Sequence, residues 1–173
     1  MAAGPTYDLI TSTKLSSAAA SIDFQSISQS YTHLRIVMYV PSFSASGQAV
    51  NMYFNNDTTS NKSQYVWRQT NESAPAGEWG FSVHKIVISG YGDTNTLTSV
   101  PTSYFIDILN YTGAQNRILV HAGQAESNTT GRLCKVIARW GGGAAINRIT
   151  FDTGSGATYG VGTTVSIYGI AKA

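Results

Sequence analysis

Hydrophobic and polar residues alternate along much of this chain with a period of two. Successive side chains of a β-strand point to opposite faces, so this period is typical of a strand with one buried face. The clearest case is residues 32–40, where Leu34, Ile36, Met38 and Val40 share one face and His33, Arg35, Val37 and Tyr39 share the other. Pro41 lacks the backbone N–H that a strand ladder needs, so we predict that the strand ends there.

The stretch 146–170 predicts two further strands, at 146–153 and 161–170, joined by a turn rich in Gly, Ser and Thr. In the second strand one face carries Val161, Thr163, Val165 and Ile167. We expect Gly154, Gly156 and Gly160 to supply the positive φ angles that a tight connection needs. We also expect this last strand to close a sheet.

The same alternation, with turn residues between the segments, predicts eight more strands. They are residues 7–13, a short strand with Ile22 and Phe24, and residues 48–54, 65–69, 81–89, 103–110, 117–122 and 133–140. Residues 55–64 and 70–80 are predicted to be exposed polar loops. No window has a helical period of 3.6, and residues 16–20 could form at most one helical turn. About 10–11 short strands favour a single all-β domain over residues 1–173, an antiparallel β-sandwich of jelly-roll type.

Composition agrees with this fold and excludes several functions. The 173 residues are 42% hydrophobic, enough for a core, and only 12% charged, about half the usual share. The net charge of +2 and the lack of any Lys/Arg run argue against a nucleic-acid partner. No apolar stretch approaches 18 residues and the N-terminus has no secretory signal, so we expect neither a membrane partner nor a leader peptide.

Residues that could carry chemistry are few and scattered. Cys134 alternates with Val136 and Ala138 and is interpreted as a small buried hydrophobe. His33, His84 and His121 lack the spacing of metal ligands and are interpreted as surface residues. Asp107 is interpreted as an outward-facing or hydrogen-bonded strand residue. We therefore predict no enzyme, no metal and no cofactor.

Aromatic residues give a stronger functional signal. They gather in the middle of the chain, several near predicted loop edges, at Tyr53, Tyr65, Trp67, Trp79, Tyr91, Tyr104 and Tyr111. Tyr and Trp are common in protein interfaces as well as in cores. The pattern leaves core packing and a protein interface equally open, and a glycan site is a lesser alternative.

Several motifs together resemble a known group of proteins. They are YDLI (7–10), LSS (15–17), IDFQSI (22–27), YTHL (31–34), YFNND (53–57) with Asn61 and Tyr65, AESN (125–128), and the ending SIYGI (166–170). The chain is similar along nearly its whole length to small virion structural proteins of tailed bacteriophages, which end in variants of S-[LI]-Y-G-I. At 55–57 this chain has Asn-Asn-Asp where the family pattern has Asn-Gly-Asp.

The resemblance implies a component of a phage particle, assembled in the host bacterial cytoplasm and located in the virion. Its motifs are structural, so it implies no active site. Our main hypothesis is a capsid decoration (cement) protein that binds the major capsid protein or other virion proteins, as a homotrimer. The alternative is a tail or tail-fibre module that binds a host receptor or glycan. For the decoration role we predict contacts from the N-terminal segment and from loops 55–64 and 70–80, at Ala2, Pro5, Tyr7, Tyr65, Trp67 and Trp79.

Overall fold

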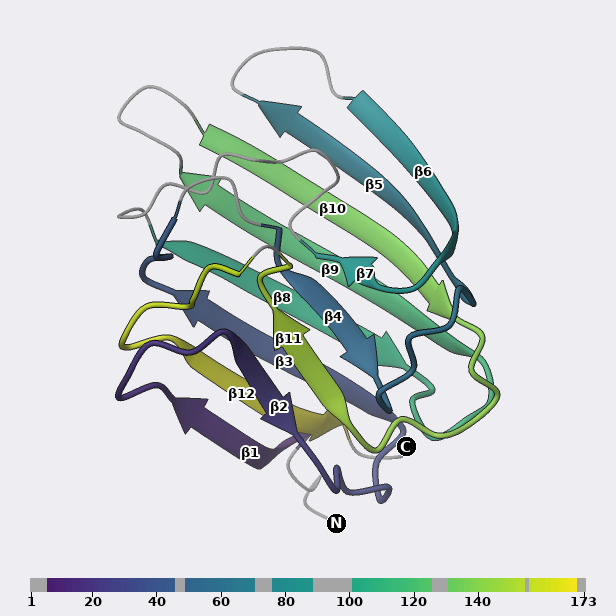
Figure 1. Ribbon diagram of the computed structural model, residues 1–173. Coiled ribbons are helices and arrows are strands. Elements are labelled where there is room, and N and C mark those ends of the chain that lie inside the picture. The colour runs from purple at the N-terminus through teal and green to yellow at the C-terminus, as the bar shows by residue number, and fades with distance from the viewer. Residues whose placement is uncertain are drawn as a thin grey trace.

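The computed structural model describes residues 6–45, 49–70, 76–88, 101–125, 131–154 and 156–170; the side chains at 68–70, 76, 78–83, 117, 122–125 and 131–133 are not described. These residues form two antiparallel sheets and no helix. Figure 1 shows the smaller sheet in front of the larger one. The prediction of an antiparallel β-sandwich is confirmed.

The larger sheet has eight strands in the order β1-β12-β3-β8-β9-β10-β5-β6. Their bounds are β1 Tyr7–Lys14, β3 His33–Val40, β5 Lys62–Thr70, β6 Ala76–Val83, β8 Thr102–Leu109, β9 Asn116–Ala125, β10 Gly131–Trp140 and β12 Thr164–Ile170. The smaller sheet has four strands in the order β2-β11-β4-β7. Their bounds are β2 Ser21–Phe24, β4 Asn51–Phe54, β7 Ile86–Val87 and β11 Ile149–Asp152.

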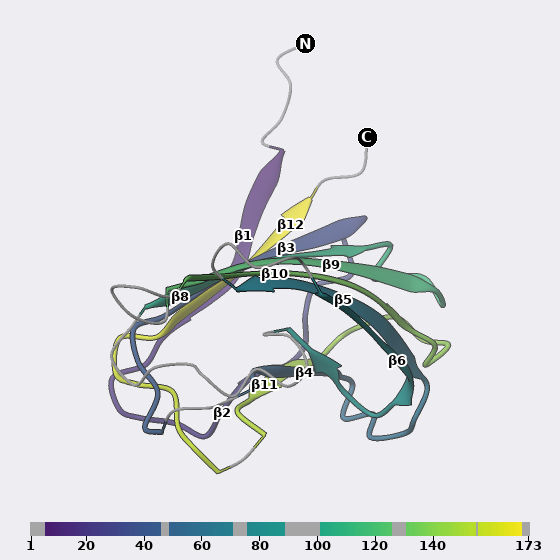
Figure 2. The ribbon, with the colours of Figure 1, turned by 90° about the horizontal axis from the view of Figure 1, so that it is seen from above.

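The strand order identifies the jelly roll. The four strands β1-β12-β3-β8 face the four strands β2-β11-β4-β7, and the chain passes from one sheet to the other in the manner of two Greek keys. Two hairpins are inserted into this framework: β5–β6 lies between β4 and β7 in the chain, and β9–β10 lies between β8 and β11. Both hairpins add to the larger sheet beyond β8. Figure 2 shows this extended sheet curving over the smaller one.

The core lies between the sheets and is built from the alternating positions that the sequence indicates. The predicted face of β3 is fully buried, and it meets buried residues of the neighbouring strands and of the smaller sheet. Representative members are Leu34, Ile36, Met38, Met52, Phe54, Ile106, Val120, Val136, Phe151 and Ile167. Cys134 is buried among them, as predicted.

Some local predictions were wrong. Residues 76–80, expected in a loop, belong to β6, because pairing with β5 outweighs the Gly and Glu content of the segment. The predicted strand 81–89 is divided between β6 and β7, and residues 62–64 begin β5. Residues 71–75 lie outside the described part.

The C-terminal strand also differs from its prediction. β12 begins at Thr164, so Val161 lies in a turn and is 61% exposed instead of facing the core. β12 lies between β1 and β3, and β1 forms the edge of the sheet. Gly154 and Gly156 have positive φ as expected, but the third glycine that does so in this region is Gly162, not Gly160.

Candidate functional site on the outer face of the large sheet

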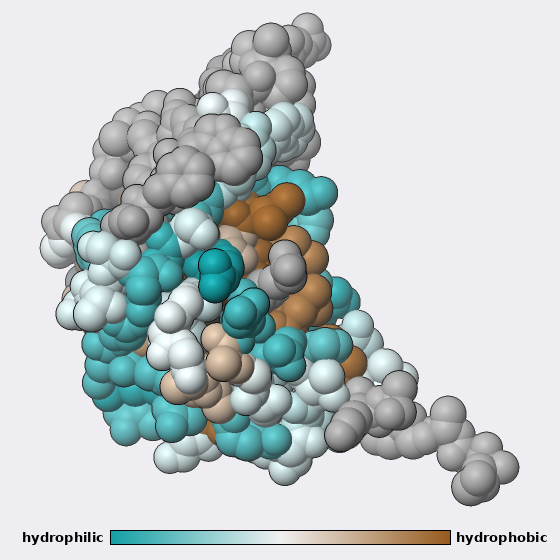
Figure 3. All heavy atoms as spheres, turned by 90° about the vertical axis from the view of Figure 1, so that its right-hand side faces the viewer, coloured by the Kyte–Doolittle hydropathy of each residue, from teal (hydrophilic) through white to brown (hydrophobic). Residues whose placement is uncertain are grey.

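The face of the large sheet that points away from the core carries an unusual number of exposed hydrophobic residues. Among the described residues, six large hydrophobic side chains are exposed, and five of them belong to strands of this sheet. These five are Tyr7, Leu9, Tyr39, Phe105 and Ile137. Tyr39, Phe105 and Ile137 alternate with core residues, so they point outward. Strand register places Leu9 on the same face, and Tyr7 precedes it by two residues. Figure 3, seen from the right-hand side of Figure 1, shows hydrophobic residues gathered in one area among mostly hydrophilic neighbours.

Strand register places several of these residues in one row across the sheet. Leu9 on β1 lies opposite Tyr168, and the row continues through Arg35, Asp107, Leu119 and Ile137 to Tyr65 on β5. Six strand spacings of about 4.8 Å make the row about 29 Å long. The adjacent row contains Val37, Phe105, His121, Lys135 and Trp67.

A groove lies at the β5–β10 end of this face. It is lined by Tyr65, Trp67, Lys135 and Ile137 and has a volume of about 470 Å³. The Tyr65 ring lies over Gly77 of β6, so close that a Cβ at Gly77 would clash with the ring and its hydroxyl. The groove therefore depends on a residue without a side chain at position 77.

The β1 end of the face is organised by Arg35. Its guanidinium makes a bidentate pair with Asp107, at 2.7 and 2.8 Å, and donates a hydrogen bond of 3.2 Å to the Tyr7 hydroxyl. The same guanidinium lies 5.4 Å from the centroid of the Tyr7 ring. Asp107 is thus a hydrogen-bonded strand residue, as predicted, and Tyr7 is held on the outer face.

Charge on the groove end of the face is positive. Lys135 and Arg139 are exposed on β10, and His121 is exposed on β9. Within the described residues, no carboxylate forms an ion pair with Lys135 or Arg139. A partner with carboxylates at its surface would complement this end.

Three of the six predicted contact residues, Tyr7, Tyr65 and Trp67, lie on this face. The structure brings Tyr65 and Trp67 together in the groove, and Tyr7 lies on the same face about six strands away. Trp79 pairs with Tyr65 in the β5–β6 register, but its side chain is outside the description. Ala2 and Pro5 also lie outside the described residues.

The other aromatic residues divide between the core and the opposite side. Tyr104 and Tyr111 are fully buried, and the Tyr111 hydroxyl donates to the carbonyl of Ser28. Tyr53 lines a pocket on the smaller sheet, and Tyr91 lies outside the description.

Sequence reasoning missed the exposed residues Leu9, Phe105 and Ile137. The available signal was a large apolar side chain at an outward position of an alternating strand, as in Val37 and Tyr39.

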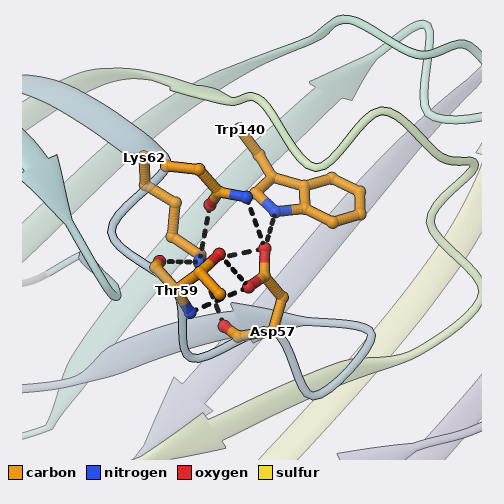
Figure 4. A network of polar contacts seen from close by, with 5 residues as sticks. Asp57, Thr59, Lys62 and Trp140 are labelled. Atoms are coloured by element: carbon orange, nitrogen blue, oxygen red, sulfur yellow. Dashed lines mark hydrogen bonds and ion pairs between the residues drawn. The ribbon is translucent and has the colours of Figure 1, made fainter.

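Loop 55–61 uses its polar groups internally. Asp57 accepts hydrogen bonds from the Thr59 backbone and hydroxyl, from Asn61 and from the Trp140 indole. The fully buried ammonium of Lys62 donates to the carbonyls of Asp57 and Thr59 and to the Asn61 side chain, as Figure 4 shows for this network. This arrangement fixes the loop against β10 and leaves few of these groups for a partner.

Over the described residues, no three His, Cys, Asp or Glu side chains gather closely enough to hold a metal ion, and no helix there is long and apolar enough to span a membrane. His84 and His121 are exposed, and His33 accepts a hydrogen bond from the backbone N–H of Asn110.

Comparison with protein-family models, with curated proteins and with solved structures finds no match to this chain.

Proposed function

We propose that this protein is a structural, non-enzymatic component of a tailed-bacteriophage virion, most specifically a capsid decoration protein. In this proposal the outer face of the large sheet docks on the major capsid protein. The motifs that resemble phage virion proteins support a role as a virion component. Viral structural proteins use the jelly roll, as do many proteins of other functions. The protein would be assembled into particles in the host cytoplasm.

The observation that carries the proposal is the extent of the outward-facing row, which has apolar residues at both ends. It reaches from Leu9 on β1 to Tyr65 on β5, about 29 Å, which is too long for one small ligand. Large exposed apolar patches mark interaction sites, and a stable protein interface takes about 800 Å² from each partner. A protein surface is therefore the partner that fits best.

The polar composition of the face fits the same partner. The Arg35–Asp107 pair lies between the two apolar ends of the row and is already satisfied within the chain. It can be covered by a partner without leaving an unpaired charge. Lys135 and Arg139, which form no ion pair with any carboxylate of the described residues, would add specificity for an acidic patch.

Copy number in purified particles is the first test. Gel densitometry compares the 18.5 kDa band with the major capsid protein band. We expect a ratio between one-to-one and one-to-a-few. A ratio of a few per cent would favour the tail or tail-fibre alternative, and absence from particles would refute both.

The docking face is tested with matched variants. Ile137→Lys and Phe105→Lys place a charge on the face, and each residue is 50% exposed, so the fold should tolerate both changes. Val161→Lys is the control, because Val161 is 61% exposed but lies outside the large sheet. We expect at least tenfold weaker binding to undecorated capsids for the first two variants and unchanged binding for the control. Equal binding by all three would refute the assigned face.

The proposal includes assembly as a homotrimer. Mass measurement by light scattering, on the free protein and on protein released from particles, tests this part separately.

A further inference from the structure

A second pocket lies on the smaller sheet, on the side of the molecule opposite the docking face. Its volume is about 390 Å³, within the range of small-molecule sites. The lining comes from four separate parts of the chain: residues 20 and 21, Tyr53, His84 with Lys85, and residues 152–154 and 156. Ser21, Tyr53 and Asp152 alternate with the core residues Ile22, Met52 and Phe151, so they point away from the core.

The carboxylate of Asp152 is held in place by a hydrogen bond from a buried side chain. Asn51 is fully buried and donates a hydrogen bond of 2.7 Å from Nδ2 to Asp152 Oδ1. Burial, and to a lesser extent the nearby carboxylate of Asp152, raises the pKa of Tyr53 to about 12. Tyr53 is therefore protonated at neutral pH, and Asp152 keeps further lone pairs for a ligand.

Gly154 allows this arrangement. Its φ is +70°, and a Cβ at this position would clash with Nδ2 of Asn51 and lie 3.6 Å from Nζ of Lys85. Backbone without a side chain therefore forms this wall of the pocket, next to the Asn51 amide and the Lys85 ammonium.

The pocket offers donors and acceptors with little net charge. Lys85 and His84 can donate, Asp152 can accept, and Ser21 can do both. One ammonium and one carboxylate in the same pocket offset each other, which disfavours both a phosphate and a metal cation. Sugar hydroxyls act as donor and acceptor at once, and the Tyr53 ring offers a surface for the C–H face of a sugar.

We propose that this pocket binds a neutral sugar, as a single residue or as the end of a glycan chain. The inference goes beyond the particle role and does not require it, because the isolated protein carries the whole pocket. If the large sheet docks on a capsid, the pocket faces away from the shell, where a glycan of the surroundings can reach it.

Saturation-transfer NMR on the full chain tests the proposal. The probes are glucose, galactose, mannose and N-acetylglucosamine, with glucuronic acid and N-acetylneuraminic acid as acidic comparisons. We expect saturation transfer to at least one neutral sugar. Asp152→Asn and Lys85→Gln should each weaken it at least tenfold, and Lys135→Gln in the groove of the large sheet should leave it unchanged. Melting temperatures of all variants establish that they are folded.

The results separate this proposal from the particle role. No transfer to any neutral sugar, or transfer only to the acidic sugars, would overturn the sugar site. Binding that survives both pocket variants but is lost in Lys135→Gln would move the ligand to the groove and also overturn it. None of these results changes the copy number in particles, which tests the particle role alone.

Discussion

The ammonium of Lys62 lies 3.4 Å from Oδ2 of Asp57, and the Lys62 side chain is completely buried. Lys62 belongs to the first position of β5, and Asp57 belongs to the loop just before it. Lys62 also donates to two loop carbonyls at 3.0 and 3.1 Å. The lysine therefore occupies the centre of loop 55–61 in the way that a bound cation would, and it joins this loop to the start of the inserted hairpin.

Removing this ammonium should destabilise the protein. In Lys62→Met the methionine fills much of the space, but the two carbonyls lose a donor and the Asp57 carboxylate loses its ion-pair partner. Breaking a buried ion pair by removing one partner costs about 3 kcal/mol. Guanidinium unfolding of the variant and the wild type measures the difference. The control is Lys135→Met on the exposed face, for which we expect a change within about 0.5 kcal/mol; equal effects of the two variants would contradict the assigned role.

Acid should weaken the same loop. Burial alone would raise the pKa of Asp57, but hydrogen bonds from Thr59, Trp140 and Asn61 outweigh it and hold the pKa well below its usual value of 3.8. A carboxyl whose pKa is lowered by folding stabilises the protein above its unfolded pKa, and this contribution is lost as the pH falls toward the folded pKa. We therefore expect stability to fall as the pH drops below about 4.

Asp57→Asn isolates this contribution from that of Asp23, whose pKa is also lowered. The variant should be less stable than the wild type at pH 7, and the difference should narrow between about pH 5 and pH 2. Thermal unfolding across this range is the measurement. A difference that does not depend on pH would show that the Asp57 charge contributes nothing.

The backbone at Asn56 makes a ranking of substitutions predictable. Asn56 has φ of +56°, in the left-handed region that favours glycine. This is the position at which the phage family pattern has glycine. We expect Asn56→Gly to be neutral or to stabilise slightly, and Asn56→Ala to destabilise by about 1 kcal/mol. Chemical denaturation gives the order, and an alanine variant at least as stable as the glycine variant would contradict it.

Gly77 gives a test of the groove that does not depend on charge. An added methyl group in Gly77→Ala would displace the Tyr65 ring, which is the end of a flexible side chain, so the cost to stability should be small. The groove should change shape, and binding to capsids should weaken at least as much as in Tyr65→Ala. Capsid binding and the melting temperature are measured together. Full binding by Gly77→Ala would show that the Tyr65 position is not needed for docking.

The candidate site could be predicted only in part. Tyr65, Trp67 and Tyr7 were identified from residue type, and they do lie on one face. The groove could not be predicted, because Ile137 and Lys135 come from β10, about 70 residues after β5, and only sheet order brings them together. The sugar pocket was missed for the same reason, since Tyr53, Lys85 and Asp152 come from distant parts of the chain.

The sequence by itself determined the strands with one apolar face, the all-β class and most of the core. A period of two fixes which side chains share a face, and burial of apolar surface then selects that face for the interior. Only the tertiary structure decided the order of the strands, the pairing of residues 76–80 as β6, and the position of β12 between β1 and β3. These depend on hydrogen bonds and packing between segments far apart in the chain, and local residue preferences carry no information about which strand becomes a neighbour.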